Sequence, residues 1–276
     1  MKRFLMLLLL ALLIPAALSE GGLPAPLTAD TNHIIDLDGD GTTELFWWTH
    51  LDRRVTRFTV EDASGDVACL DMDIYFDEGP HPCDVDGDGL LELLLNRHGE
   101  NEYVSCWCMQ YRNGELYSVL FPHSFQGSVS TTYYDTWIPG ELIAQRDGSI
   151  TIRALLNPLF QVYFYLLDLR PTLHGRFEPV DGIYYLDEDK NSRYYYIQTI
   201  VDLNYESGGP QTLPAGTWLK LTRTDFSTFA DFVTEDGLDG RFTISEHRIR
   251  SYENDVLFTI QGLTPDEAFT HYVVGN

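Results

Sequence analysis

Short runs of apolar residues, separated by turn-forming residues, recur along most of the chain. Two of these runs, at residues 45–49 and 93–97, each follow a loop rich in aspartate and glycine. Each is followed by a second apolar run, a tight turn at residues 64–67 or 113–116, and a third run. Apolar runs of this length, bounded by Gly, Asn and Asp, are typical of β-hairpins. The pattern therefore predicts an all-β protein.

The two loops belong to an internal duplication. Both carry the pattern D-x-D-G-D-G-x-x-E-L, and the second copy follows the first by 48 residues. A period of this size with several short strands per unit is typical of propeller blades and related β-sheet arrays. A closed propeller needs about four blades, and only two units are clear. A third unit over residues 137–169, with a hairpin turn at residues 147–148, is expected without the aspartate loop.

The spacing of oxygen-bearing residues in each loop predicts a metal site. Carboxylates at positions 1, 3 and 5 converge when the chain curls round a cation, glycine at 6 allows the turn, position 7 offers a backbone carbonyl, and an acid at 9 completes the shell. Hard oxygen ligands in this number suit Ca²⁺ better than Mg²⁺. The sequence thus predicts two Ca²⁺ sites. The expected ligands are Asp36, Asp38, Asp40, Thr42 and Glu44 in the first loop, and Asp84, Asp86, Asp88, Leu90 and Glu92 in the second.

These loops admit two other interpretations. An EF-hand needs a bidentate glutamate at position 12, but Trp47 and Leu95 stand there and strand residues follow. The other interpretation is an acidic turn that holds no ion. Three carboxylates in one turn repel one another without a cation, so two copies of such a turn favour the metal site.

Both loops resemble the FG-GAP or VCBS type of extracellular repeat, which carries Ca²⁺ loops in integrin-like propellers and in many secreted bacterial proteins. The resemblance covers roughly residues 30–120, and this chain has glutamate in place of aspartate at position 9. It implies an extracellular scaffold or adhesion role in which the metal has a structural function.

The C-terminal part has a different pattern. Five strand-like runs, separated by turn signals, suggest a small barrel or sandwich. They lie at residues 182–186, 194–203, 216–222, 241–249 and 255–262, and a short helix is expected at residues 265–269. The segment at residues 213–217 is similar to small bacterial barrels of the SH3 type. The triad of Asp187, Asp189 and Asn191 is interpreted as a turn rather than a metal site.

The N-terminus has the layout of a signal peptide. Two basic residues precede an apolar run over residues 4–14, and small residues precede a cleavage position after Ser19. The run is too short to span a membrane, which takes about 20 residues. We expect a signal peptide at residues 1–19, a repeat domain at 20–175 and a small β domain at 176–276. The mature protein is expected to be secreted, or associated with the cell surface, with no membrane segment.

Composition narrows the choice of partner. With 18 basic and 42 acidic residues, the formal net charge is −24. Nucleic-acid binding depends on clustered Lys and Arg, so a nucleic-acid partner is not expected. The remaining expectation is an extracellular glycan or protein. A non-enzymatic binding or scaffold role is favoured, and the alternative is a secreted glycan hydrolase whose carboxylate pair cannot be identified among so many acids.

Cysteines and aromatic residues leave alternatives open. Cys69 and Cys83 are the closest plausible disulfide, whereas Cys106 and Cys108 face the same side of one strand and are not expected to pair. Buried thiols are an equally acceptable interpretation. The five tryptophans could stack on sugars, although most are expected in the core. His33 and His81 recur at the repeat offset and are interpreted as packing positions.

Overall fold

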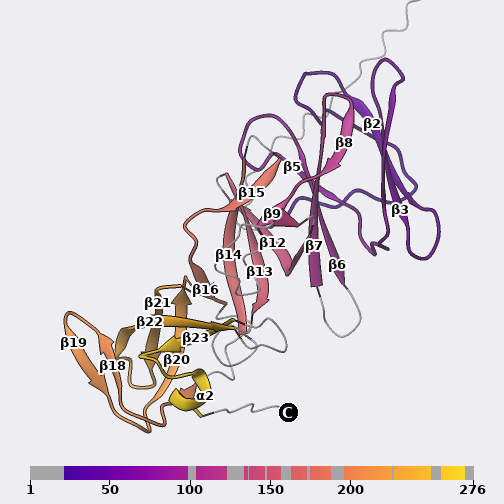
Figure 1. Ribbon diagram of the computed structural model, residues 1–276. Coiled ribbons are helices and arrows are strands. Elements are labelled where there is room, and N and C mark those ends of the chain that lie inside the picture. The colour runs from indigo at the N-terminus through magenta and orange to yellow at the C-terminus, as the bar shows by residue number, and fades with distance from the viewer. Residues whose placement is uncertain are drawn as a thin grey trace, which may run out of the picture.

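The computed structural model describes residues 22–98, 104–122, 134–135, 137–146, 148–156, 163–172, 175–187, 196–225, 227–249 and 256–270. Within them the chain is almost entirely antiparallel β-structure, so the all-β prediction is confirmed. Figure 1 shows the sheets following one another along an elongated molecule. The expected signal peptide lies outside the described residues.

Each repeat unit folds as a four-stranded antiparallel sheet. The first unit consists of β1 (His33–Ile35), β2 (Glu44–His50), β3 (Thr56–Glu61) and β4 (Val67–Met72). The second consists of β5 (His81–Cys83), β6 (Glu92–His98), β7 (Val104–Arg112) and β8 (Glu115–Ser118), with β11 (Trp137–Pro139) added beside β7. The sequence predicted three strands per unit. The additional strand precedes each loop and is only three residues long.

The register of strand pairing is duplicated together with the sequence. Leu45 lies opposite Glu61 in the first unit, and Leu93 lies opposite Met109 in the second. Both members of the pair are displaced by 48 residues, the offset of the sequence repeat. The pairing of β1 with β2 and of β5 with β6 follows the same rule. Residues that share a position in the repeat therefore share a position in the sheet.

Both predicted hairpin turns form. Asn113 and Gly114 make a two-residue turn between β7 and β8, with φ angles of 54° and 77°. Positive φ at both positions is what a type I′ turn requires. The turn in the first unit is a five-residue loop at residues 62–66, between β3 and β4.

The remaining strands form one long, open sheet. Its main path runs β12-β13-β14-β16-β20-β21-β22-β18-β19, with β15, β17 and β23 at its sides. A two-stranded sheet of β9 (Phe121–Pro122) and β10 (Tyr134–Asp135) lies beside it. The ends of the main path, β12 and β19, do not pair, so the described strands form no closed barrel. Bounds in the long sheet are β12 (Glu141–Arg146), β13 (Ser149–Leu156), β14 (Tyr163–Thr172), β15 (Arg176–Pro179), β16 (Tyr184–Leu186), β17 (Ile197–Gln198), β18 (Leu203–Glu206), β19 (Pro210–Leu213), β20 (Trp218–Thr224), β21 (Phe229–Thr234), β22 (Asp239–Ile249) and β23 (Val256–Ile260).

Most of the C-terminal expectations are met. Four of the five predicted strands appear as β16, β20, β22 and β23, and the helix α2 (Pro265–Ala268) lies where it was expected. In the described part of the fifth, residues 196–203, the structure has the two-residue β17 and the first residue of β18. The sequence pattern did not predict β19, β21 or most of β18. The strand β21 carries the mostly buried Asp231. This carboxylate accepts hydrogen bonds from Arg223 of β20 and Arg241 of β22.

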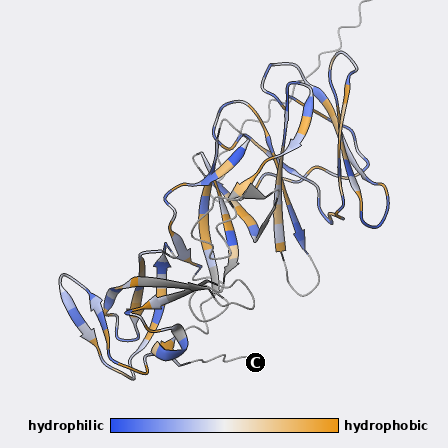
Figure 2. Cartoon of the chain, in the orientation of Figure 1, coloured by the Kyte–Doolittle hydropathy of each residue, from blue (hydrophilic) through white to orange (hydrophobic). Residues whose placement is uncertain are grey.

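Apolar and polar residues alternate along many strands, so the sheets bury side chains on their facing sides (Figure 2). A first core, with Phe46, Phe58 and Trp107, lies between the first two sheets. The strand β6 is buried on both faces, because Leu93 lies in this first core and Leu94 lies in the next. The second unit is therefore an inner layer of the stack.

The second core joins the second unit to the long sheet, and the third core belongs to the C-terminal strands. Phe177, Tyr184 and Leu186 belong to the second core, and the third core begins at Ile197. The change of core thus follows Leu186. The boundary expected at residue 175 lies within the β14–β15 hairpin.

Residues 22–32 form an N-terminal strap that crosses both repeat units. His33 and His81, which share a position in the repeat, each hydrogen-bond a strap carbonyl, at Thr28 (3.0 Å) and Pro24 (2.6 Å) respectively. In addition, the Leu27 amide donates to the carbonyl of Pro80. The duplicated histidines therefore anchor the start of the described chain as well as packing within their units.

Candidate metal centre

The loops occupy the same place in the two units, between β1 and β2 and between β5 and β6. The backbone takes the same course in both, since Gly39 and Gly41 have φ angles of 71° and 86°, and Gly87 and Gly89 have 77° and 91°. These left-handed conformations favour glycine, which explains the fixed glycines of the pattern.

The first aspartate of each loop organises the turn. Asp36 accepts hydrogen bonds from the amides of Gly39 (2.8 Å) and Gly41 (3.0 Å). Asp84 accepts the equivalent bonds from Gly87 (2.7 Å) and Gly89 (3.1 Å). These bonds contribute to the curled course of each loop.

The curled loops bring their carboxylates together. In each triad, Asp36, Asp38 and Asp40 or Asp84, Asp86 and Asp88, one oxygen per side chain lies within 4.8 Å of the others. Burial, with the neighbouring charge of Asp88, raises the pKa of Asp86. Closely spaced, partly buried carboxylates are the donor set that a hard divalent cation neutralises, so these residues fit Ca²⁺.

The glutamates at position 9 are placed differently from the expectation. Glu44 is 4% exposed and its Oε2 accepts the amide of Leu37 at 2.7 Å, and Glu92 is 1% exposed and accepts the amide of Val85 at 2.9 Å. Each glutamate thus holds the second residue of its loop by a buried hydrogen bond. Neither belongs to the aspartate triads that the structure brings together.

Glu92 has a further partner that the sequence analysis did not find. The side-chain amide of Gln110 donates to its Oε1 at 2.6 Å, and Tyr117 in turn donates to Gln110. Burial raises the pKa of Glu92 to about 7, against the lowering effect of these hydrogen bonds. Burial and the triad charges also raise the pKa of Glu44. The register of β6 with β7 places Glu92 opposite Gln110.

Position 7 of each loop was expected to offer a carbonyl. The amide of Thr42 donates to Asp40 at 2.6 Å, and the amide of Leu90 donates to Asp88 at 2.8 Å. These residues therefore lie two positions after the last aspartate of each triad and are hydrogen-bonded to it.

The two loops touch each other, which the sequence did not indicate. The amide of Leu91 donates to the carbonyl of Leu37 at 3.0 Å. A Cβ added to Gly39 would lie 2.4 Å from the carbonyl oxygen of Gly89. Only a glycine fits this approach, so the contact between the loops depends on the glycine at position 4 of the first copy.

The prediction of a disulfide between Cys69 and Cys83 is wrong. All four cysteines lie among the described residues and none forms a disulfide. Cys69 is on the exposed face of β4, whereas Cys83, Cys106 and Cys108 are buried in the second core. Burial also raises the pKa of the Cys83 and Cys108 thiols, and the interpretation as buried thiols holds for three of the four cysteines.

The other residues that the sequence suggested for metal or sugar binding have structural roles where the structure describes them. Asp187 is 3% exposed and forms an ion pair with Arg153, which also binds Glu141, while Asp189 and Asn191 lie outside the described residues. Trp48 and Trp107 are buried in the first core. Among the described residues no helix has the length and apolar character needed to cross a membrane.

Comparison of the chain with protein-family models, with curated proteins and with solved structures gives no match. The resemblance to FG-GAP and VCBS repeats therefore stays a prediction, and so does the similarity to SH3-type barrels.

Proposed function

We propose that this protein is an exported scaffold or adhesion module with two structural Ca²⁺ ions, one in each aspartate loop. The observation that carries the proposal is the duplicated triad, in which three carboxylates converge at the same position of two sheets. The partner would be an extracellular glycan or protein. The alternative of a glycan hydrolase stays a prediction, because no feature of the described residues favours it.

The role proposed for Ca²⁺ is to stabilise the fold. A bound cation neutralises the repulsion within each triad, while Asp36 and Glu44, or their equivalents, hold the loop curled. Extracellular modules bind Ca²⁺ with dissociation constants of about 10⁻⁴–10⁻³ M. At about 1 mM Ca²⁺ and a constant near 0.1 mM, each site would contribute about 1.4 kcal/mol to the free energy of unfolding.

Thermal unfolding in EGTA and in increasing Ca²⁺ tests the proposal. Two sites predict a rise of the midpoint by about 5–10 °C at 1 mM Ca²⁺. Asp38→Asn combined with Asp86→Asn should remove most of this rise. The amide keeps the oxygen that accepts the weak 3.3 Å hydrogen bond in each loop, so the turn itself is retained.

A matched control removes the same charge from turns without a triad. Asp52 and Asp225 each accept backbone amides in an aspartate turn. Asp52→Asn with Asp225→Asn should therefore keep the full response to Ca²⁺. An equal response in both double variants, or none in the parent protein, would refute the metal sites.

A further inference from the structure

The first unit covers one surface of the second unit. The equivalent surface of the first unit is not covered by the described chain. At the second unit, Leu91 donates its amide to Leu37, and Leu37 packs in one core with Leu91 and Leu93. A loop of the first unit thus covers the edge where β6 begins. Its contact combines an aliphatic side chain with one backbone hydrogen bond.

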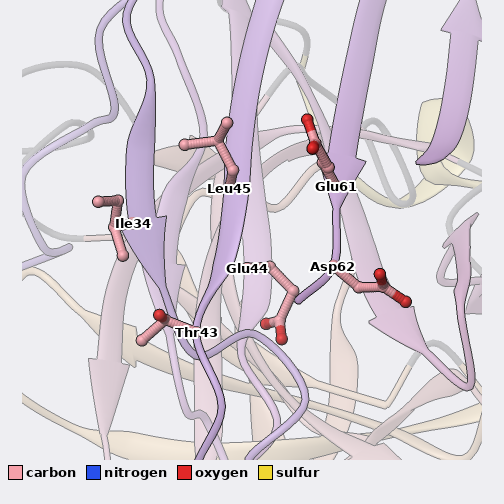
Figure 3. Close-up of a pocket in the computed structure, with 6 residues that line it drawn as sticks. All are labelled: Ile34, Thr43, Glu44, Leu45, Glu61 and Asp62. Carbon is pink, nitrogen blue, oxygen red and sulfur yellow. The ribbon is translucent and has the colours of Figure 1, made fainter. Parts of the chain in front are cut away.

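The equivalent surface of the first unit lies 48 residues earlier and forms a pocket. Thr43 and Leu45 correspond there to Leu91 and Leu93, and Ile34 corresponds to Pro82. Figure 3 shows these residues around the pocket together with Glu44, Glu61 and Asp62. Ile34 is 75% exposed, and within the described residues no carbonyl accepts the Thr43 amide.

The polarity of the pocket differs from that of its covered counterpart. Glu61 and Asp62 stand where the second unit has Met109 and Gln110. In the second unit Gln110 donates to the second oxygen of the buried glutamate. Asp62 carries no donor when ionised, and none of the described residues donates to Oε1 of Glu44. Glu61 and Asp62 therefore give this pocket an acidic rim, where the covered counterpart has uncharged residues.

We propose that this pocket binds an extended segment of a partner protein in which an aliphatic residue adjoins a lysine or arginine. The aliphatic side chain would pack on Ile34 and Leu45, as Leu37 packs on the second unit. The cationic group would face Glu61 and Asp62. A backbone carbonyl of the segment would accept the Thr43 amide.

Three features of the site select this occupant. The carboxylates exclude an acidic segment, because like charges would be desolvated side by side. The aliphatic wall distinguishes the site from a simple acidic surface, since Lys and Arg stems bury apolar area while their charged ends stay polar. The internal contact provides the geometry for the backbone bond. The proposal does not depend on metal in the loops.

The test is a titration of the ¹⁵N-labelled protein followed by amide chemical shifts. The probe is an acetylated and amidated Gly-Lys-Leu-Lys-Gly peptide, with Gly-Glu-Leu-Glu-Gly and Gly-Lys-Ser-Lys-Gly as comparison peptides. We expect saturable shifts at Ile34, Thr43 and Leu45 with the first peptide, at a dissociation constant on the order of 10⁻⁴ M. The other two peptides should bind at least about tenfold more weakly. The titration is repeated in EGTA and in Ca²⁺, and the shifts should be present in both.

Variants separate the site from the general charge of the protein. Glu61→Gln with Asp62→Asn should weaken binding about tenfold. The asparagine keeps the oxygen that caps the turn at Ser64. Ile34→Ser should weaken it about fivefold and, because Ile34 is exposed, should leave the fold intact. Glu178→Gln with Glu235→Gln removes the same charge from exposed positions elsewhere and should change binding less than twofold.

Three results would overturn the proposal. One is an equal loss of affinity in the control variant, which would mean attraction to the net charge alone. Another is the absence of saturable shifts at Thr43 and Leu45. The last is self-association of the free protein that Ile34→Ser abolishes, which would identify a second copy as the occupant.

Discussion

Glu44 and Glu92 occupy the same position of the repeat but have different surroundings. Each accepts the backbone amide of the second residue of its loop, which links the start of the loop to the strand that follows it. Gln110 completes the polar contacts of Glu92, whereas Glu44 has Asp62 at the equivalent position. The same side chain is thus fully engaged in the inner layer of the stack and partly unmatched in the outer layer.

The buried Glu92 predicts a pH dependence of stability. In the unfolded chain this group loses its proton near its ordinary pKa of 4.5, but in the folded protein it holds the proton to about pH 7. The folded state binds more protons between these values, so the free energy of unfolding decreases as pH rises from about 4.5 to 7. The decrease attributable to Glu92 is up to about 3 kcal/mol.

Urea unfolding in EGTA at pH 5 and pH 8 measures this effect. Glu92→Gln should reduce the difference between the two pH values, whereas Glu115→Gln, at an exposed position, should leave it as in the parent. An unchanged difference in Glu92→Gln would show that this carboxyl does not titrate as the structure indicates.

The cysteines predict a simple pattern of thiol reactivity. Cys69 is exposed and the other three are buried, so one thiol should react rapidly with a disulfide reagent in the native protein. Four should react after unfolding without reductant. Cys69→Ser should remove the fast reaction and leave three thiols in the unfolded chain. Only two thiols in the unfolded parent would reveal a disulfide that the structure does not contain.

At the scale of elements, the loops are coupled through one close approach. Gly39 and Gly87 have equivalent positions and similar φ angles of 71° and 77°. A Cβ on Gly39 would meet Gly89, whereas a Cβ on Gly87 would have nothing within 4 Å. Any difference in the free energy of unfolding between alanine substitutions at the two sites therefore measures the contribution of the contact between the loops.

Gly87→Ala should lower the free energy of unfolding by about 1 kcal/mol, because a left-handed conformation is unfavourable for alanine. Gly39→Ala should lower it by about 2 kcal/mol more, because the added methyl group must displace backbone. Chemical denaturation of both variants under the same conditions gives the comparison. Equal losses of stability in the two variants would mean that the loops can move apart at Gly39 with no loss of free energy.

The hairpins and the loops could be predicted because their signals are local. Asn113-Gly114 prescribes a type I′ turn, and the spacing of aspartates prescribes a curled loop. The three-residue strands β1 and β5 are too short to show periodicity. The contact between Gly39 and Gly89 could not be predicted, since the left-handed backbone of each loop already favours glycine at both positions. Gln110 was missed because its role depends on the register of β6 with β7.

At the scale of the whole molecule, the sheets are joined by buried polar contacts as well as by cores. Asn96 of β6 accepts the amide of Leu142 at 2.9 Å and donates to its carbonyl at 3.0 Å. Leu142 is on β12, so this pair joins the second unit to the long sheet. Gln145 makes a second link, by donating to the carbonyl of Asp84 in the second loop.

Asn96→Ala should lower the free energy of unfolding by about 3 kcal/mol, because it leaves a buried amide and a buried carbonyl without partners. Asn204→Ala removes an exposed asparagine and should change stability by less than about 0.5 kcal/mol. Thermal unfolding of both variants decides the matter. A loss at Asn96 no larger than that at Asn204 would mean that water replaces the side chain.

The N-terminal strap bears on the order in which the chain is completed during synthesis. The amide of Leu27 donates to the carbonyl of Pro80, and the buried face of the first sheet packs in one core with Trp107 of the second unit. Since a chain emerges from its N-terminus onward, Leu27 and the buried face of the first sheet acquire these partners only after the corresponding residues of the second unit have been made. The first unit therefore completes its packing only with residues that are synthesised after it.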